Sequence, residues 1–302
     1  MENQIIVSIE CCVFNHEPFL RQCLDGFVMQ KTNFAFEAIV HDDASTDGSA
    51  AIIMEYAERY PDIIKPIIET ENQYSKRDGS LRKVLNAHLK GKYIAWCEGD
   101  DYWTDPLKLQ KQVDYLERHE DCGIVYSRAK RWKEEKQTYG SGVGHEVRDF
   151  RDLIKTNVVP TLTVMFRSEL VIDYWEMIKE KNWLMADYPL WLHLSSISKI
   201  HFFDETFGVY REHGGSATHK SNIDTREKFT DSIRDIQLFF CNKNNIDPSF
   251  VDDVYYNNLY YNAIYFEDYE RAFKYYKKVK HPNFILFLSY IKNRTKTMFR
   301  KA

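Results

Sequence analysis

Apolar runs and one-sided helical patterns alternate along the first part of the chain. Residues 5–9 are β-branched and almost continuously apolar, which is typical of a strand covered on both faces. A helical stripe follows, made of Leu20, Cys23, Leu24, Phe27 and Val28. The unit then repeats, with strands expected at 36–40, 63–68 and 93–97 and a helix over 52–60. This alternation predicts an α/β fold with a mainly parallel sheet, whose ligand site lies at the carboxyl ends of the strands.

The middle of the chain has a less regular pattern. It predicts further strands at 123–127, 161–166, 200–203 and 207–210, and helices at 106–119, 170–178 and 188–196. Residues 129–150 are charged and contain Gly140, Gly142 and Gly144. We therefore expect a surface excursion or flexible loop there, which is either solvated linker or a mobile lid over a site.

Helical periodicity takes over from about residue 222, and the strand pattern disappears. We expect a first domain over residues 1–220 and a C-terminal α-helical region over 221–302. The tail combines an apolar start at 284–288 with five basic residues, Lys292, Arg294, Lys296, Arg300 and Lys301. This pattern is typical of a membrane-surface helix or of a capping helix with a solvated basic end.

Composition and charge exclude several classes of protein. A chain of 302 residues with 44% hydrophobic and 28% charged residues can build a sizeable core, and a net charge of -4 gives no basic surface for nucleic acid. The six cysteines have no paired ligand spacing, which predicts neither a zinc site nor a disulfide framework and fits a reducing compartment. No secretory signal begins the sequence, and no window reaches the roughly 18 apolar residues of a spanning helix. We expect a cytoplasmic protein, with association to a membrane surface left open.

Three carboxylates follow the strand at 93–97, and they are the first candidate for chemistry. Glu98, Asp100 and Asp101 cluster on a turn that contains Gly99, where their charges would repel one another unless a cation lies between them. A divalent metal is one interpretation. Ordinary turn chemistry before a helix that begins near Asp105 is the other.

Two further acidic positions support a site. Asp42 and Asp43 follow the strand at 36–40, so they are expected at the same edge of the sheet as the turn after residue 97. Asp187 lies among aromatic and apolar residues just ahead of a predicted helix. Desolvation there would raise the pKa of Asp187 and make it a better base, although an N-cap for the helix explains the same residue locally.

Four motifs in order resemble the inverting family 2 glycosyltransferases. They are Val7-Ser8-Ile9 through Phe14-Asn15-His16-Glu17-Pro18-Phe19-Leu20, His41-Asp42-Asp43-Ala44-Ser45-Thr46-Asp47-Gly48-Ser49, Gly91-Lys92-Tyr93-Ile94 through Glu98-Gly99-Asp100-Asp101, and Tyr210-Arg211-Glu212-His213 with Ser216. The resemblance covers roughly residues 4–218. It implies the A-type glycosyltransferase fold, a single Rossmann-like nucleotide-sugar-binding sheet with flanking helices, so that residues 1–220 would form the catalytic domain.

The resemblance also implies roles for individual residues. Those expected to bind the nucleotide are Phe14, Glu17, Asp42, Asp43, Glu98, Gly99 and Arg211. Asp100 and His213 match the family's metal site, and Glu98 stands where the family usually has an aspartate. Asp187 matches the catalytic base, although Ala186 replaces the acid that usually precedes it.

The function implied is a metal-dependent inverting glycosyltransferase that uses Mn²⁺ or Mg²⁺. It would transfer a sugar of the hexosyl or N-acetylhexosaminyl type from a nucleotide-sugar donor, expected to be a UDP-sugar, to a glycan or lipid-linked acceptor in surface polysaccharide or glycoconjugate synthesis. A dinucleotide-dependent oxidoreductase is disfavoured because no G-x-G-x-x-G follows the first strand. A catalytically inactive nucleotide-sugar-binding or scaffold protein of the same fold is the alternative. The sequence does not predict the donor sugar, the acceptor, the linkage or the oligomeric state.

Overall fold

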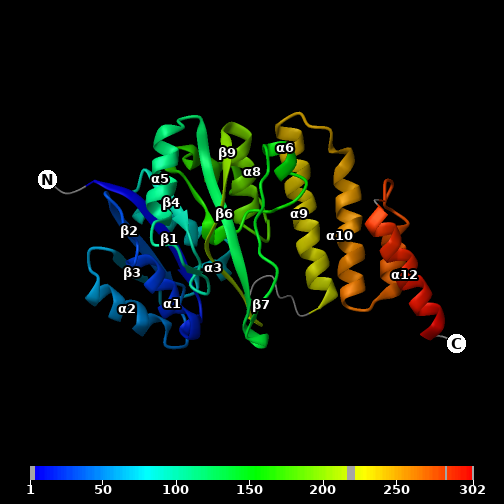
Figure 1. Cartoon of the computed structure of the whole chain (residues 1–302), viewed down its shortest axis with the longest axis horizontal. Helices are drawn as coiled ribbons and strands as arrows, with labels where there is room; N and C mark the ends of the chain where they lie inside the picture. Colours follow the sequence, from blue (N-terminus) through cyan, green and yellow to red (C-terminus); the bar gives the residue numbers. More distant parts are fainter. Residues whose placement is uncertain (1–3, 216–221, 283, 301–302) are drawn as a thin grey trace. The chain divides into compact units, whose positions relative to one another are not determined.

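The computed structural model describes residues 4–215, 222–282 and 284–300. The chain forms two compact units (Figure 1). The first comprises Met1–Phe150, Val158–Glu180 and His193–Gly214, and the second comprises Arg151–Asn157, Lys181–Leu192 and Gly215–Ala302. Ser216 of the predicted histidine motif and the predicted domain boundary after residue 220 lie outside the described residues.

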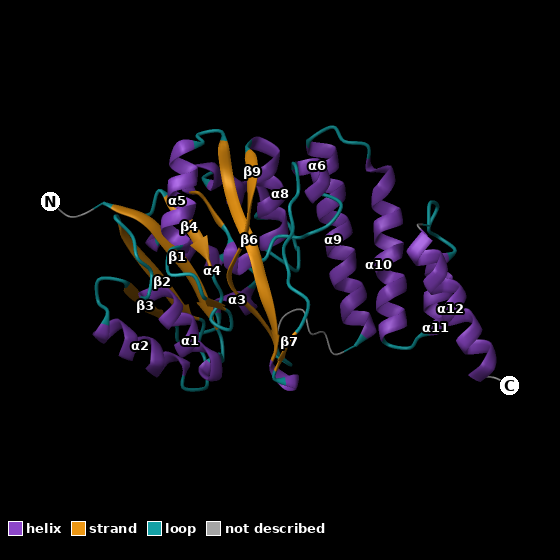
Figure 2. Ribbon diagram, viewed as in Figure 1, coloured by secondary structure: helices purple, strands orange, loops and turns teal. Residues whose placement is uncertain are grey.

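The described strands all belong to one sheet in the first unit (Figure 2). They are β1 (Ile5–Val13), β2 (Ala35–Asp42), β3 (Ile64–Ile68), β4 (Tyr93–Trp96), β5 (Tyr102–Trp103), β6 (Cys122–Lys133), β7 (Thr138–Tyr139), β8 (Met165–Arg167) and β9 (Lys199–Glu212). Their order is β3-β2-β1-β4-β8-β6-β9-β5, and β7 pairs with β6. The strands from β3 to β4 are parallel, as are β6 and β9, whereas β8, β5 and β7 run antiparallel to their neighbours. Because β8 is antiparallel to both β4 and β6, strands β1 to β4, β6 and β9 all run in one direction, so the described sheet is mixed but mainly parallel, as predicted.

The helices are distributed over both units. The first unit contains α1 (Glu17–Val28), α2 (Ser49–Arg59), α3 (Gln73–Lys76), α4 (Ser80–His88), α5 (Lys108–Arg118) and α7 (Tyr174–Ile178). The second contains α9 (Ile223–Lys243), α10 (Val251–Tyr265), α11 (Tyr269–Tyr276) and α12 (Phe284–Arg300). Helices α6 (Phe150–Leu153) and α8 (Asp187–Ile197) have residues in both. Short 3-10 helices cover Glu134–Lys136, Thr161–Thr163, Ser168–Val171 and Pro248–Phe250.

Alternation along β1 explains how the core of the first unit forms. Val7, Ile9 and Cys11 are fully buried in the same cluster as the predicted stripe of α1, which includes Leu24 and Phe27. Because successive strand residues point to opposite faces, every second residue of β1 packs against this helix. The hydrophobic pattern of β1 and α1 therefore explains why this helix packs against the sheet.

The strand order reverses between β1 and β4. From β1 the chain moves outward through β2 to β3 and then returns to β4 on the other side of β1. In open α/β sheets the point where the strand order reverses is where ligands bind. Asp42 ends β2 and the acidic turn follows β4, so both candidate clusters lie at this edge of the sheet.

Residues 129–150 do not form the predicted loop throughout. Strand β6 continues to Lys133 and pairs with β9 as far as Glu212, and β7 adds a short antiparallel partner. Ala129 is buried between the exposed residues Arg128 and Lys130, which is the alternation of a strand covered on one face. The charges of this stretch hid that alternation in the sequence.

Three other predictions of elements were wrong in detail. The two short strands expected at 200–203 and 207–210 form one strand, β9, because its pairing with β6 continues through irregularities in register. The strand expected at 161–166 begins with a 3-10 helix, so β8 starts at Met165. The helix expected at 170–178 is divided into a 3-10 helix and α7, and the sequence analysis did not anticipate α3 and α4.

The second unit is helical, as predicted for the C-terminal region (Figure 2). Helix α10 contacts both α9 and α11, and α11 contacts α12. The small core there consists of Tyr260, Ala263, Ala272, Val279 and Leu286. None of the helices in the described part of the chain is both long enough and apolar enough to span a membrane.

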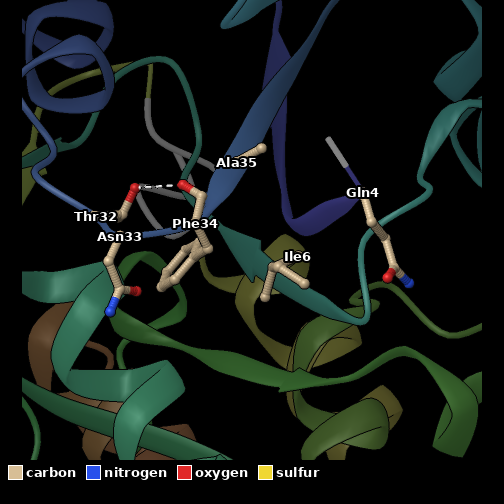
Figure 3. Close-up of a pocket in the computed structure, with 6 residues that line it drawn as sticks. All are labelled: Gln4, Ile6, Thr32, Asn33, Phe34 and Ala35. Carbon is tan, nitrogen blue, oxygen red and sulfur yellow. Dashed lines mark hydrogen bonds between the residues drawn. The ribbon is translucent and has the colours of Figure 1, made fainter. Parts of the chain in front are cut away.

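A cavity of about 430 Å³ lies at the other end of β1 and β2 (Figure 3). It is lined by Gln4, Ile6, Thr32, Asn33, Phe34 and Ala35. These residues flank the amino ends of the two strands, and their side chains carry no titratable group. The cavity is therefore separate from the acidic edge and offers no acid or base for chemistry.

Candidate functional site

The two carboxylates after β2 have different partners. Asp42 is 1% exposed and accepts a hydrogen bond from Ser45 N at Oδ2 (3.1 Å), while its buried Oδ1 has no hydrogen-bond partner in the described part of the chain. Asp43 accepts hydrogen bonds from Gln73 N at Oδ1 (2.6 Å) and from Tyr74 N at Oδ2 (3.0 Å). Asp43 thus fixes the start of α3 against the end of β2, whereas one acceptor oxygen of Asp42 is not used by the described residues.

The loops after β1 and β2 are tied together at this edge. Asn15 N donates to Ser45 Oγ (2.9 Å), and Glu17 Oε2 accepts a hydrogen bond from Gly48 N (2.8 Å). Phe14 is 48% exposed beside these contacts. The structure therefore brings Phe14 and Glu17 to the same strand ends as Asp42, with Glu17 also holding the two loops together.

The acidic turn after β4 is held against the end of β1. Gly99 N donates to Cys12 O (3.1 Å), and Asp101 N donates to Glu98 O (3.1 Å). A Cβ at Gly99 would lie 2.8 Å from His16 Nδ1, so a side chain there would displace the histidine. Glu98 is exposed at this turn, whereas Gly99, Asp100 and Asp101 are buried.

Asp100 lies beside two histidines. Its Oδ2 is 3.0 Å from His213 Nε2, and its Oδ1 is buried with no hydrogen-bond partner among the described residues. Burial opposes ionisation of Asp100, but the hydrogen bond from His213 and the electrostatic influence of both histidines outweigh it and lower the pKa of this carboxyl group. Burial lowers the pKa of His16, against the opposing charge of Asp100. The result is an ionised carboxylate with one open oxygen beside imidazole nitrogen.

These groups fit part of the coordination shell of a divalent cation. Carboxylate oxygen and imidazole nitrogen are both ordinary ligands of Mn²⁺, and Mg²⁺ is commonly held by one or two carboxylates together with substrate phosphates. Within the described residues, no group of three or more His, Cys, Asp or Glu side chains could hold a metal ion. Asp100 and His213 would therefore act with ligands from the substrate or from water.

Asp101, next to Asp100 in the chain, is used for structure. It is 4% exposed, and its Oδ1 accepts a hydrogen bond from Arg211 N (2.8 Å). Burial, together with the charge of Asp100, raises the pKa of Asp101 well above its ordinary value, although the Arg211 N–H opposes this shift. This supports the interpretation of Asp101 as a turn-forming residue.

Arg211 joins the turn to three other segments. Its Nε donates to Asp100 O (2.9 Å), while Nη1 donates to Glu134 Oε2 (2.8 Å) and Nη2 to Gln22 Oε1 (2.7 Å). The guanidinium also lies 4.7 Å from the ring centre of Phe19. Arg211 is 6% exposed, and its hydrogen bond to Asp100 O holds the backbone of Asp100 in place.

Asp187 is the first residue of α8 and belongs to the second unit. The next residue, Tyr188, is buried, and its hydroxyl lies 3.2 Å from Leu153 O and 2.9 Å from Ile154 O. These contacts fix the beginning of α8 within that unit. The other predicted site residues belong to the first unit, and that unit gathers them at the sheet edge without Asp187.

Sequence reasoning missed two half-buried polar groups near these turns. One is His16, whose position inside the Phe14 to Leu20 motif was a signal that could have been used. The other is Arg82, which donates to both carboxylate oxygens of Glu10 (2.6 and 2.7 Å) and lies 4.2 Å from the ring centre of Trp175. An acid inside the apolar run of β1 could have predicted such a cationic partner.

Comparison with solved structures identifies the class of fold. Staphylococcus aureus TarS 1-349 in complex with UDP-GlcNAc is similar with a TM-score of 0.59 and 17% identity, over 87% of this chain and 73% of that chain. The mannosyltransferase PcManGT from Pyrobaculum calidifontis, in complex with GDP-Man and Mn²⁺, has a TM-score of 0.58 and 16% identity, over 90% of this chain and 76% of that chain. These likenesses and the sheet with its flanking helices confirm the predicted A-type glycosyltransferase fold.

Sequence comparison then gives the family. The chain matches the sequence model of glycosyl transferase family 2 over residues 8–175. An uncharacterized protein of Mycobacterium tuberculosis (strain ATCC 25618 / H37Rv) is 35% identical over 232 residues, which are 73% of this chain and 63% of that protein. The chain belongs to glycosyl transferase family 2, as its motifs predicted, and it spans less than two thirds of that relative's length.

Proposed function

We propose that this protein is an inverting, metal-dependent glycosyltransferase that transfers a sugar from a UDP-sugar to a hydroxyl group of a glycan or lipid-linked acceptor. The observation that carries the proposal is Asp100, an ionised and buried carboxylate whose Oδ1 has no hydrogen-bond partner within residues 4–215, 222–282 and 284–300. It lies where the strand order reverses, inside the segment that matches the family.

The nucleotide would bind at the carboxyl ends of β1, β2 and β4. Phe14 offers an exposed ring for stacking on the base, and Asp42 Oδ1 offers a buried acceptor for a donor group of the base or ribose. Glu98 and Gly99 line the turn beside the ribose, while Glu17 and Arg211 hold the loops that surround it. Asp43 supports the pocket through α3.

Asp100 and His213 would hold Mn²⁺ or Mg²⁺ at this edge. When bound, the cation supplies Lewis-acid stabilisation of the negative charge on the departing nucleoside diphosphate. The hydrogen bond between His213 and Asp100 orients the carboxylate so that Oδ1 stays available. The complexes of the two structural neighbours with a nucleotide sugar, one of them with Mn²⁺, support this assignment.

Asp187 would act as the catalytic base. It removes the proton from the acceptor hydroxyl as that oxygen attacks the anomeric carbon from the face opposite the diphosphate, which inverts the anomeric centre. One carboxylate is sufficient because a diphosphate leaving group does not need the protonation that a glycoside hydrolase must provide with its second carboxylate. We propose that the acceptor belongs to a surface polysaccharide or glycoconjugate pathway and that the reaction occurs in the cytoplasm.

The test combines donor binding with donor turnover. Binding of UDP and of GDP is measured by calorimetry with and without Mn²⁺, and hydrolysis is then measured over a panel of UDP- and GDP-sugars. We expect Mn²⁺-dependent binding of UDP, hydrolysis of at least one UDP-sugar, and loss of the Mn²⁺ dependence in Asp100→Ala. Absence of nucleotide binding under every condition would contradict the donor assignment, and preference for GDP would contradict the choice of UDP.

The base is tested separately with Asp187→Asn. This variant should bind UDP normally and lose turnover by about 10²- to 10⁴-fold, the usual contribution of a general base. Asp252→Asn is a matched control, because Asp252 is also an acid in the first turn of a helix of the second unit. Full turnover in Asp187→Asn would show that another group accepts the proton.

A further inference from the structure

Helix α12 presents apolar side chains on the face opposite its packed side. Leu286 is 1% exposed in the small core of the second unit, and the Tyr290 ring stacks on Tyr276 with 3.9 Å between ring centres. Phe284, in contrast, is 73% exposed. The helix therefore docks through one face and leaves a second apolar face uncovered by the described residues.

We define the exposed stripe as Phe284, Phe287, Leu288 and Ile291. These residues follow the spacing i, i+3, i+4 and i+7, and each is between 45% and 73% exposed. At 100° per residue they occupy one side of the helix, and Lys292 and Arg294 fall on the two flanks of that side. Both cations are exposed. An apolar stripe with a cation on each flank is the arrangement of helices that lie in a lipid–water interface.

The charge around the exposed stripe selects its partner. From residue 284 to the last residue of the sequence there are five Lys or Arg residues and no Asp or Glu. A second copy of the chain placed on the stripe would bring the same cations against one another, which is unfavourable. An anionic lipid surface instead accepts the apolar side chains between its acyl chains and the cations among its headgroups.

We propose that the exposed stripe of α12 binds anionic lipid surfaces. The apolar side chains would enter the boundary between headgroups and acyl chains, while Lys292 and Arg294 would reach the lipid phosphates. This attachment is peripheral and depends on salt, because the electrostatic part is screened within a Debye length. It is independent of nucleotide chemistry, so its test stands apart from that of the proposed transferase activity.

The experiment is co-sedimentation of the full chain with vesicles of phosphatidylcholine alone and of phosphatidylcholine with phosphatidylglycerol. We expect binding to the anionic vesicles that falls as salt is added, and little binding to the neutral ones. The double variant Phe287→Ser/Ile291→Ser should lose this binding. Its control, Met54→Ser/Ile172→Ser, removes two apolar residues of the first unit that are 52% and 74% exposed, and it should bind as the unchanged chain does.

The contribution of charge is tested with Lys292→Gln/Arg294→Gln. At about 1 kcal/mol for each basic residue near an anionic surface, the partition coefficient should fall about thirtyfold. The control Lys83→Gln/Lys90→Gln removes the same charge from exposed lysines of the first unit and should leave binding nearly unchanged. Circular dichroism of every variant checks that the helices are retained.

Three results would overturn the proposal. The first is absence of binding to anionic vesicles at low salt. The second is an equal loss of vesicle binding in the variants of α12 and in their controls. The third is self-association without lipid that Phe287→Ser/Ile291→Ser abolishes, because a second copy of the chain would then cover the exposed stripe.

Discussion

The turns after β2 and β4 use their acidic residues in the same way. Each contains two consecutive aspartates at the carboxyl end of a strand. In each turn one aspartate is bound by backbone N–H, while the other has a buried oxygen that finds no hydrogen-bond partner among the residues that the structure describes. Asp43 and Asp101 are the structural members, and Asp42 and Asp100 are the open ones. Each acidic dipeptide thus combines one carboxylate bound by backbone N–H groups with a second that we propose as a ligand group.

The two turns differ in what surrounds the open carboxylate. Asp42 is held by Ser45 N, whereas Asp100 is flanked by His213 and the half-buried His16. A single acceptor suits recognition of an N–H or O–H group, while a carboxylate beside imidazole suits a cation. The difference supports the proposal that the turn after β2 recognises the base or ribose and that the turn after β4 binds the metal.

The largest effect on donor turnover is expected when the two aspartates after β4 are replaced one at a time by asparagine. Asp100→Asn removes the charge that would face the cation, so donor turnover in Mn²⁺ should fall about 10²- to 10³-fold, as when one electrostatic stabiliser of a transition state is lost. Asp101→Asn keeps an oxygen that can accept from Arg211 N, so turnover should change by less than about threefold. Steady-state hydrolysis of a UDP-sugar measures both, and equal losses would break the distinction between open and structural carboxylates.

Arg211 tests how the turn after β4 is supported. Arg211→Lys cannot reach Asp100 O, Glu134 and Gln22 at the same time. It should lower the free energy of unfolding by about 3 kcal/mol, because two hydrogen bonds of a charged group are lost at about 1.5 kcal/mol each. Urea denaturation measures this loss. Arg131→Lys is the control: its contact with Glu212 is 3.7 Å long and half-exposed, so less than about 1 kcal/mol should be lost. An equally small loss of unfolding free energy in both variants would show that Arg211 does not support the turn after β4.

The sequence predicted this edge of the sheet well because the motifs lie at strand ends. Apolar runs located β1, β2 and β4, and an acidic residue directly after a buried strand is visible without a structure. The division of labour within each pair was not visible, because it depends on Gln73, Tyr74 and Arg211, which are remote in sequence from the carboxylates they contact. Local pattern identifies the groups, and long-range backbone contacts decide their use.

The β6 region shows the opposite case. Charged side chains between buried ones gave β6 the appearance of a loop after residue 128, although its pairing with β9 makes it a strand to Lys133. Tertiary pairing overrides a weak local pattern there.

Asp187 is a third case, since its assignment as a base rests on the family motif and stays a prediction.

A smaller effect is expected from the pair after β2. Asp43→Ala removes the acceptors of two backbone N–H groups at the start of α3, so the free energy of unfolding should fall by about 2 kcal/mol, near the upper value for a lost cap. Asp42→Ala removes one backbone contact and should cost about 1 kcal/mol. Nucleotide affinity should follow the reverse order, with the greater loss in Asp42→Ala. Urea denaturation gives the loss of stability and calorimetry gives the loss of nucleotide affinity in the same two variants. If one variant shows the greater loss in both, the division into a structural Asp43 and a ligand-binding Asp42 is contradicted.

The smallest expected effect is a change in the pH dependence of stability. Because the pKa of Asp101 is raised in the folded protein, its contribution to stability is present below the ordinary aspartate pKa of about 3.9 and is lost as pH rises through the folded value. Asp101→Asn does not titrate, so its stability relative to the unchanged chain should increase as pH rises from 5 to 8. The pKa of Asp121 is instead lowered by its hydrogen bond with Lys199, so the control Asp121→Asn should show no such increase. Urea denaturation at each pH gives the difference, and a difference for Asp101→Asn that stays constant or decreases with pH would mean that the buried carboxyl group titrates as an ordinary aspartate.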